Sequence, residues 1–189
     1  LSVAPELCVF KNRDEDSGWA VMSSELSWTS GMSWNSDAAP VSSTQVTTSA
    51  TIINLAQGAF NVNGYSGSGG DMICYAFHSV EGYSKVASYV GNGNADGPFI
   101  YTGFRPAFVM VKSTTAVRDW LIYDDKRNTY NPLTKRLYPN LNNAEETFST
   151  PYDFVSNGLK TRSSVDSWNG SGETHIVLAF AESPFKTAN

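Results

Sequence analysis

Side chains suited to catalysis are few in this sequence and lie far apart. The two histidines are His78 and His175, and no Gly-x-Ser-x-Gly element offers a nucleophile elbow. Asp124 and Asp125 are adjacent, so on a strand they would point to opposite faces and could not flank one bond together. We expect no enzyme and no catalytic residue. The alternative is a triad assembled from distant residues.

One glycine-rich loop resembles a metal site. Residues 92–97, Asn-Gly-Asn-Ala-Asp-Gly, echo a calcium loop, in which oxygen side chains at alternate positions surround the ion. Only Asp96 carries charge, and Gly103 stands at the twelfth position, where such a loop needs a bidentate glutamate. A turn between two strands is a sufficient explanation. The sequence therefore predicts no metal and no other cofactor.

Aromatic side chains are the best candidates for a binding surface. Several lie in Ser-, Asn- and Gly-rich segments outside the most apolar strands, and exposed Trp and Tyr rings are platforms for sugars or proteins. The alternative is that these rings cap the edges of a sandwich or fill a seam between units. The candidate ligand-binding residues are Trp28, Trp34, Tyr65, Tyr83, Tyr130 and Trp168.

Composition sets the class of protein that must position these residues. The 189-residue chain is 41% hydrophobic and only 16% charged, so it should fold into one or two cores. Its net charge of −5 disfavours nucleic acid and anionic membranes as partners, and no run approaches the roughly 20 apolar residues of a membrane span. Fifteen glycines and short apolar runs without a long amphipathic segment predict an all-β fold.

The chain repeats itself at a spacing of about one hundred residues. Residues 5–11 resemble 106–112 at a shift of 101, and residues 72–77 resemble 175–180 at a shift of 103. Trp19 and Trp120 recur at the first shift, so we expect both in the cores. At a shift of 105, the pairs are Thr29 with Thr134, Met32 with Leu137, Asn35 with Asn140, and Ala39 with Ala144.

This order predicts two tandem, duplicated β-sandwich units of jelly-roll or lectin-like type, residues 1–85 and 86–189. Asn157-Gly158 predicts a hairpin with a type I′ turn. Strands such as 107–111 are apolar on both faces, which indicates burial on both sides or packing against the neighbouring unit.

The first unit is expected to be incomplete. The opening strand of the second unit, 86–90, has no counterpart in the first, and Leu1 rather than Met begins the chain, so we expect sequence upstream. An open apolar edge invites pairing with another chain. We expect the edge near residues 1–10 to be covered by that upstream sequence or by a neighbouring subunit.

Cys8 and Cys74 are the only cysteines. Their places in the second unit hold Val109 and either Ile176 or Val177, so apolar side chains serve there. We therefore expect two reduced, buried thiols. A disulfide across the sandwich is the alternative.

Several segments resemble a repeated unit in predicted virion proteins of bacteriophages, many from marine sampling. The segments are Pro5–Asn12, His78–Lys85, Ser88–Gly93, Gly97–Pro106, Trp120–Tyr123 and Ala179–Lys186. Such units occur in tail-fibre-like and other surface proteins, for which a lectin-like jelly roll is commonly inferred. The resemblance supplies no catalytic residue.

The resemblance and the aromatic residues together predict a non-enzymatic virion surface protein, tail-fibre-like, that adheres to a glycan of the host surface. Its partners would be copies of itself, in a trimer, and other virion proteins, and its location the virion surface outside the cell. One alternative is a structural module that decorates the capsid or tail without a host ligand. The other is a carbohydrate-binding part of a glycan hydrolase, which facing carboxylates in a cleft would favour.

Overall fold

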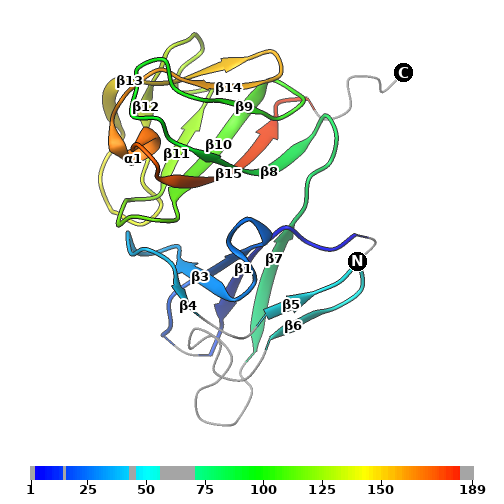
Figure 1. Ribbon diagram of the computed structural model, residues 1–189. Helices are drawn as coiled ribbons and strands as arrows, with labels where there is room; N and C mark the ends of the chain where they lie inside the picture. Colours follow the sequence, from blue (N-terminus) through cyan, green and yellow to red (C-terminus); the bar gives the residue numbers. More distant parts are fainter. Residues whose placement is uncertain (1–2, 15, 43–45, 56–70, 184–189) are drawn as a thin grey trace. The chain divides into compact units, whose positions relative to one another are not determined.

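The computed structural model describes residues 3–14, 16–42, 46–55 and 71–183, and nearly all of its elements are β-strands (Figure 1). The predicted all-β fold is confirmed. The chain divides into two compact units, Leu1–His78 and Ser79–Asn189. The division precedes the boundary expected between residues 85 and 86, which falls inside strand β8 (Ser84–Val90). That strand pairs along its whole length with β15 (Thr174–Ala181) and so belongs to the second unit.

The first unit is built on one five-stranded antiparallel sheet and a hairpin. The sheet order is β4 (Val41–Ser42), β3 (Ser30–Ser33), β2 (Ala20–Ser23), β1 (Leu7–Asn12) and β7 (Met72–Phe77). The hairpin pairs β5 (Val46–Thr48) with β6 (Ile53–Leu55), and a 3-10 turn, η1 (Ser24–Leu26), follows β2. Cys8, Phe10, Ala20, Met22 and Val46 form its core.

The second unit is a sandwich of two four-stranded antiparallel sheets. The first sheet has the order β11 (Leu121–Asp124), β10 (Pro106–Ser113), β15 and β8. The second has the order β12 (Leu133–Arg136), β13 (Glu146–Val155), β14 (Gly158–Thr161) and β9 (Phe99–Tyr101). One short helix, α1 (Asp166–Asn169), precedes β15. No helix among the described residues is long and apolar enough to cross a membrane.

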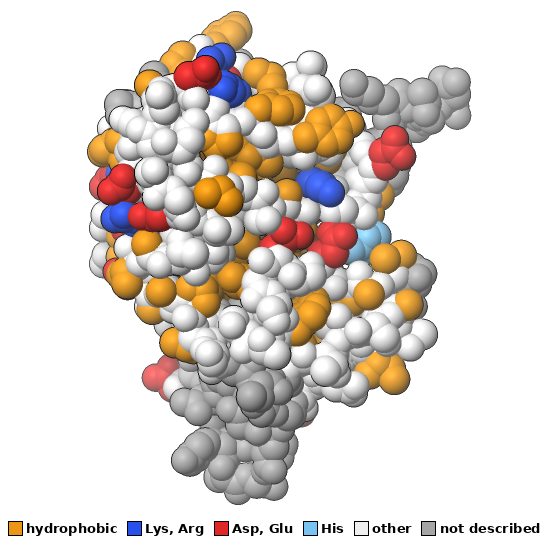
Figure 2. All heavy atoms as spheres, in the orientation of Figure 1, with side chains coloured by type: hydrophobic (Ala, Val, Ile, Leu, Met, Phe, Trp, Pro, Cys, Tyr) orange, Lys and Arg blue, Asp and Glu red, His pale blue; other side chains and the backbone are white. Residues whose placement is uncertain are grey.

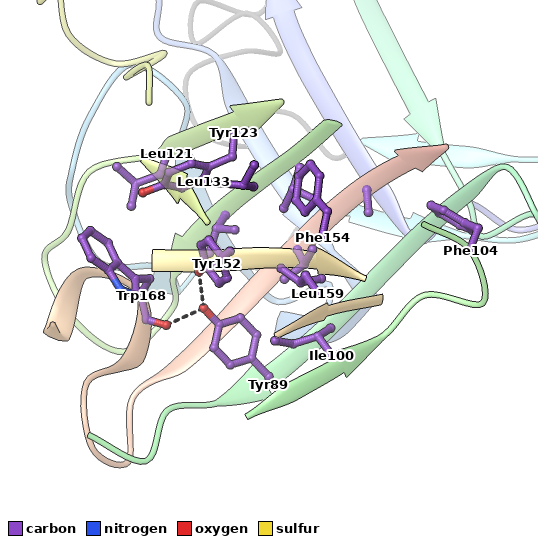
Figure 3. Close-up of a cluster of buried hydrophobic side chains, with 14 residues drawn as sticks. Tyr89, Ile100, Phe104, Leu121, Tyr123, Leu133, Tyr152, Phe154, Leu159 and Trp168 are labelled. Carbon is purple, nitrogen blue, oxygen red and sulfur yellow. Dashed lines mark hydrogen bonds between the residues drawn. The ribbon is translucent and has the colours of Figure 1, made fainter. Parts of the chain in front are cut away.

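Both sheets of the second unit contribute to its core (Figure 3). Val109 and Val177 of one sheet and Phe154 of the other belong to the same buried cluster, because alternate residues of each strand point inward. The Tyr89 hydroxyl bridges this core: it lies 2.7 Å from the Tyr152 hydroxyl and donates to the Trp168 carbonyl at 2.6 Å. Burial raises the pKa of both tyrosines, so these phenols stay neutral and hydrogen-bonded.

The central strands of the two units share one register. Every residue pair between β1 and β2 recurs 101 residues later between β10 and β11; Cys8 opposite Met22 becomes Val109 opposite Tyr123. The pairing of β1 with β7 likewise recurs between β10 and β15, with the second partner shifted by 103.

Hydrogen bonds beyond these strands recur as well. The Trp19 N–H donates to Asn35 Oδ1 at 3.0 Å, and the Trp120 N–H donates to Asn140 Oδ1 at 3.1 Å. The Val21–Met32 pair of β2 and β3 reappears as the Ile122–Leu137 bridge. The correspondence therefore extends to a fourth strand segment, at the shift of 105 seen in the sequence.

The units differ in what lies beside these strands. β1 is an interior strand between β2 and β7, so the expectation of an open edge near residues 1–10 is wrong. In the described part of the chain the sheet ends at β7, whose counterpart β15 pairs with β8 in the second unit. The prediction failed because β8 pairs with β15, the counterpart of β7, and not with β10, the counterpart of β1.

Two expectations about burial are wrong. Cys8 and Cys74 are both free, but only Cys8 is buried, because Cys74 lies on the edge strand. Trp120 is 1% exposed, as expected, whereas Trp19 is half-buried and stacks on Tyr75 of β7, with ring centroids 6.4 Å apart.

Candidate binding site

A pocket opens in the second unit where the turn before β8 faces the end of β9. Its volume is about 300 Å³, at the lower end of the range for small-molecule sites, a size suited to one sugar ring. The lining residues are Ser79, Val80, Glu81, Ser84, Lys85, Tyr101, Thr102 and Gly103.

Backbone hydrogen bonds form the turn on one side of the pocket. Val80 N–H donates to Ser84 O at 3.0 Å, and Tyr83 N–H donates to Val80 O at 3.0 Å. Gly82 has φ of +71°, a conformation that a side chain would disfavour. These bonds fix the backbone that carries Glu81 and leads into Lys85, the second residue of β8.

The opposite side of the pocket is fixed by the bend after β9. The Thr102 hydroxyl donates to Phe104 O at 2.5 Å, and Thr102 N–H donates to Asn157 O at 3.1 Å. Gly103 follows with φ of +84°. Because its own hydroxyl is bonded to the main chain, Thr102 supports the site more than it offers a free group to a ligand.

β9 presents an aromatic face beside the pocket. Ile100 points into the core and is 4% exposed, whereas its neighbours Phe99 and Tyr101 point outward and are 46% and 64% exposed. The strand next to β9 begins with Gly158, where a Cβ would lie 2.2 Å from Ile100 O and 2.8 Å from the Phe99 ring. Glycine is needed at this position for the close approach of the backbone.

This close approach corrects the expected turn. The hairpin predicted at Asn157-Gly158 exists, but Gly158 pairs with Val155 as a strand residue and the turn consists of Ser156 and Asn157. Neither turn residue has positive φ, so the turn is not type I′.

The charges of the pocket are Lys85 and Glu81. Within the described residues neither side chain has an ion-pair partner within 4.0 Å, unlike Lys126 or Lys160. An ammonium donor and a carboxylate acceptor beside an exposed ring can bind hydroxyl groups and the apolar face of a sugar. Glu81 is the single carboxylate in the lining, whereas glycoside hydrolysis ordinarily requires two.

Of the six aromatic residues predicted from the sequence, three belong to the second unit and differ in exposure. Tyr83 is 38% exposed on the pocket turn, tilted against Phe180 at 5.8 Å between centroids. Tyr130 is 83% exposed on the loop before β12. Trp168 has no exposed surface and belongs to the core, so it is not part of a binding surface.

The remaining three predicted residues belong to the first unit. Trp28 is half-buried and packs against the core of that unit. Trp34 is half-buried and meets Trp19 edge-on, with centroids 6.2 Å apart. Tyr65 lies outside the described residues. An aromatic group of Trp19, Trp34 and Tyr75 therefore exists in the first unit; the sequence analysis named Trp34 as a binding candidate, assigned Trp19 to the core and did not name Tyr75.

The pocket residues Tyr101, Lys85 and Glu81 were missed. Binding residues were sought only outside the most apolar strands, so Phe99 and Tyr101 were not considered, although only Ile100 between them lies in the core. The signal that could have found them is the alternation along residues 99–101 at the end of a short strand.

The loop that resembles a calcium site is occupied by protein contacts. Asn169, itself fully buried, accepts from Asn92 N–H at 2.9 Å and donates to Asn94 O at 2.7 Å. Asp96 pairs with Lys160 at 2.6 Å, which lowers the pKa of the carboxyl. Among the residues that the structure describes, no three His, Cys, Asp or Glu side chains are grouped to hold a metal.

The adjacent aspartates also have protein partners. Asp124 pairs with Arg127, and the buried Asp125 pairs with Arg105 at 3.2 Å. On the face drawn in Figure 2, charged side chains are scattered in small groups among uncharged and hydrophobic ones.

A family model described as "Domain of unknown function (DUF7483)" matches residues 1–184, nearly the whole chain. No curated protein and no solved structure matches it.

Proposed function

We propose that this chain, which belongs to the DUF7483 family, is a non-enzymatic, lectin-like module of a bacteriophage surface protein that binds a glycan of the host envelope. The observation that supports this proposal is the preformed pocket with the exposed Tyr101 ring beside Lys85 and Glu81. The virion setting, in a tail fibre or a comparable appendage, rests on the resemblance of the strand segments to bacteriophage surface proteins.

The pocket would recognise a sugar by two kinds of contact. The Tyr101 ring would pack against the C–H face of the sugar, and Lys85 and Glu81 would bond to its hydroxyl groups. A pocket of this size would bind one residue of a polysaccharide weakly. In a homo-oligomer, several weak sites on one appendage would act together and raise the overall affinity.

The test is binding of the full chain to an array of immobilised bacterial lipopolysaccharides and capsular polysaccharides. Tyr101→Ala should reduce binding to the recognised polysaccharide by roughly fivefold, since stacking contributes about 1 kcal/mol. Tyr130→Ala is the matched control, because that ring is more exposed and lies outside the pocket lining. Absence of binding to any polysaccharide, or equal binding by Tyr101→Ala, would refute the proposal.

The second candidate function is a structural module that joins virion subunits without a host ligand. The observation that favours it is the uncharged open edge of β7. Localisation of the chain in an electron-microscopy map of an intact particle separates the two functions. An adhesin presents the pocket to solvent, whereas a structural module is covered by other virion proteins.

A further inference from the structure

The edge of β7 offers unpaired backbone groups in the first unit. Arg13 N–H donates to Asp71 O at 2.8 Å, so odd-numbered residues of this strand bond to β1. In an antiparallel ladder the backbone N–H and C=O groups of successive residues point alternately to the neighbouring strand on one side and on the other. Met72, Cys74 and Ala76 therefore direct their N–H and C=O groups away from β1, where no described strand lies.

The second unit shows what such an edge accepts. At the shift of 103, Cys74, Tyr75 and Ala76 correspond to Val177, Leu178 and Ala179 of β15. The three β15 residues are at most 4% exposed and pair with β8, an antiparallel strand of seven residues. Their counterparts in β7 are all exposed, and Tyr75 is 45% exposed. Among the described residues, the first unit thus leaves the place of one antiparallel strand beside β7 unfilled.

β7 also lacks the features that keep edge strands apart. Natural edges are protected by charged side chains, prolines, bulges or short length. β7 has six uncharged residues, no proline and no register shift along β1. Other edge strands differ: β8 carries Lys85, β12 carries Lys135 and Arg136, and β4 has only two residues.

We propose that β7 pairs with β7 of a second copy of this chain, antiparallel about a two-fold axis normal to the sheet. A two-fold axis normal to the sheet leaves the core-facing side of both β7 strands on the same side of the joined sheet. Even-numbered residues of one strand therefore lie opposite even-numbered residues of the other, and odd opposite odd. The register with Cys74 opposite Cys74 of the partner subunit forms hydrogen bonds through Met72, Cys74 and Ala76. In the next allowed register, Tyr75 lies opposite Tyr75 of the partner subunit. Only Cys74 and Ala76 of each β7 then form backbone hydrogen bonds across the axis.

We infer that the strand beside β7 comes from a second copy of the chain, because β7 is itself uncharged and has the same length as its symmetry mate. Two identical edges related by a two-fold axis are self-complementary. No like charges face each other across this pairing. Two six-residue strands bury less than the roughly 1,200 Å² of a standard interface, so the dimer should be weak and reversible. Avidity from other contacts of a fibre would strengthen it.

Cys74 provides the test. In a hydrogen-bonded antiparallel pair the two Cα atoms lie about 5.5 Å apart, within disulfide range. Cys8→Val removes the competing thiol in a full-length chain. Oxidised glutathione should then link two Cys74 thiols across the dimer, and each bond formed reduces one glutathione disulfide to two thiols. We expect a linked dimer whose yield rises with protein concentration, and sedimentation should show the same dimer without oxidant.

The matched variants place a lysine on the edge or away from it. Ala76→Lys in the Cys8→Val chain should lower the dimer yield about tenfold or more, because the ammonium group would have to lose hydration beside the pairing edge without gaining an acidic partner. Thr47→Lys, at an exposed residue of β5, should leave the yield unchanged.

Three results would overturn the proposal. They are a chain that stays monomeric at all concentrations, a linked dimer equally abundant in Ala76→Lys, and an edge occupied by a strand of another virion protein. Each result leaves glycan binding at the pocket untouched, because the pocket lies wholly in the second unit.

Discussion

The two units keep the same central register and complete it differently. β1, β2 and β7 repeat β10, β11 and β15 pair by pair. The second unit adds β8 to this arrangement and closes it with a complete second sheet, whereas among the described residues the first adds β3, β4 and a two-stranded hairpin. A duplicated unit would retain such a register, because a slip of one residue would turn every core side chain outward.

The difference teaches that register and burial have separate causes. Register follows from the strand pattern and from bonds such as Trp19 to Asn35 and Trp120 to Asn140. Burial depends on what is added beside and above those strands. Cys74 and Val177 occupy the same place in the register, yet one is exposed and the other fully buried.

The largest expected effect comes from the closed core of the second unit. Trp168 is fully buried, and its ring lies 5.5 Å from Phe148 and beneath the Arg136 guanidinium. Trp168→Ala should lower the free energy of unfolding of this unit by about 3–5 kcal/mol. Guanidinium unfolding followed by hydrogen exchange in each unit measures the change.

The control for this variant is Trp28→Ala in the first unit. Trp28 packs against its core but is half-buried, so we expect a smaller loss, about 1–2 kcal/mol, since less surface is removed from contact. Equal losses in the two units would contradict the contrast between a closed and a partly open core.

Acid should destabilise the second unit through His175, whose counterpart in the first unit is Met72. Burial lowers the pKa of His175 below its ordinary value of 6.5, and the nearby Lys112 acts in the same direction. Glu173, with an oxygen 4.0 Å from Nε2, and a backbone hydrogen bond to Asp166 oppose this shift only in part. The unfolded chain therefore binds a proton first as the pH falls.

The stability of the second unit should be complete above pH 6.5 and decline below it, by at most about 1.4 kcal/mol per pH unit. His175→Met should remove this slope between pH 7 and 5. Below about pH 4.5 a separate loss is expected, because the Arg118 hydrogen bond lowers the pKa of Glu173. Urea unfolding at each pH tests both steps, and an unchanged slope in His175→Met would exclude His175 as its source.

The sequence allowed the register of the central strands to be predicted but not their neighbours. The apolar runs around Val109 and Val177 align with those around residues 8 and 74 in the sequence, which left Ile176 or Val177 as the counterpart of Cys74, and the strand pairing selects Val177. Which strand covers an edge depends on contacts between residues far apart in sequence. β8 precedes β10 in the chain but pairs with β15, so the open edge was expected at β1 and lies at β7.

The candidate site was harder to predict than the fold. Tyr83 was named, and it lies on the turn that forms one side of the pocket. Tyr101 and Lys85 were not named, because one lies in a short apolar strand and the other is an ordinary lysine in sequence. The two come together only where the ends of β8 and β9 approach each other.

The smallest expected effect tests the shared register most directly. Asn35→Ala and Asn140→Ala each remove the acceptor for a tryptophan N–H, and each should cost about 1 kcal/mol. Asn140→Ala should cost more, because Asn140 is half-buried and also donates to Asp119 Oδ1 at 2.7 Å. Asn35→Asp retains the acceptor for the Trp19 N–H and should preserve much of the stability of the first unit, whereas Asn140→Asp would oppose the carboxylate of Asp119 and should not. Amide exchange at Trp19 and Trp120 should accelerate only in the unit that carries the alanine. If the Trp19 amide still exchanges slowly in Asn35→Ala, the Trp19–Asn35 and Trp120–Asn140 hydrogen bonds are not equivalent. The correspondence between the two units would then be limited to the pairing of their strands.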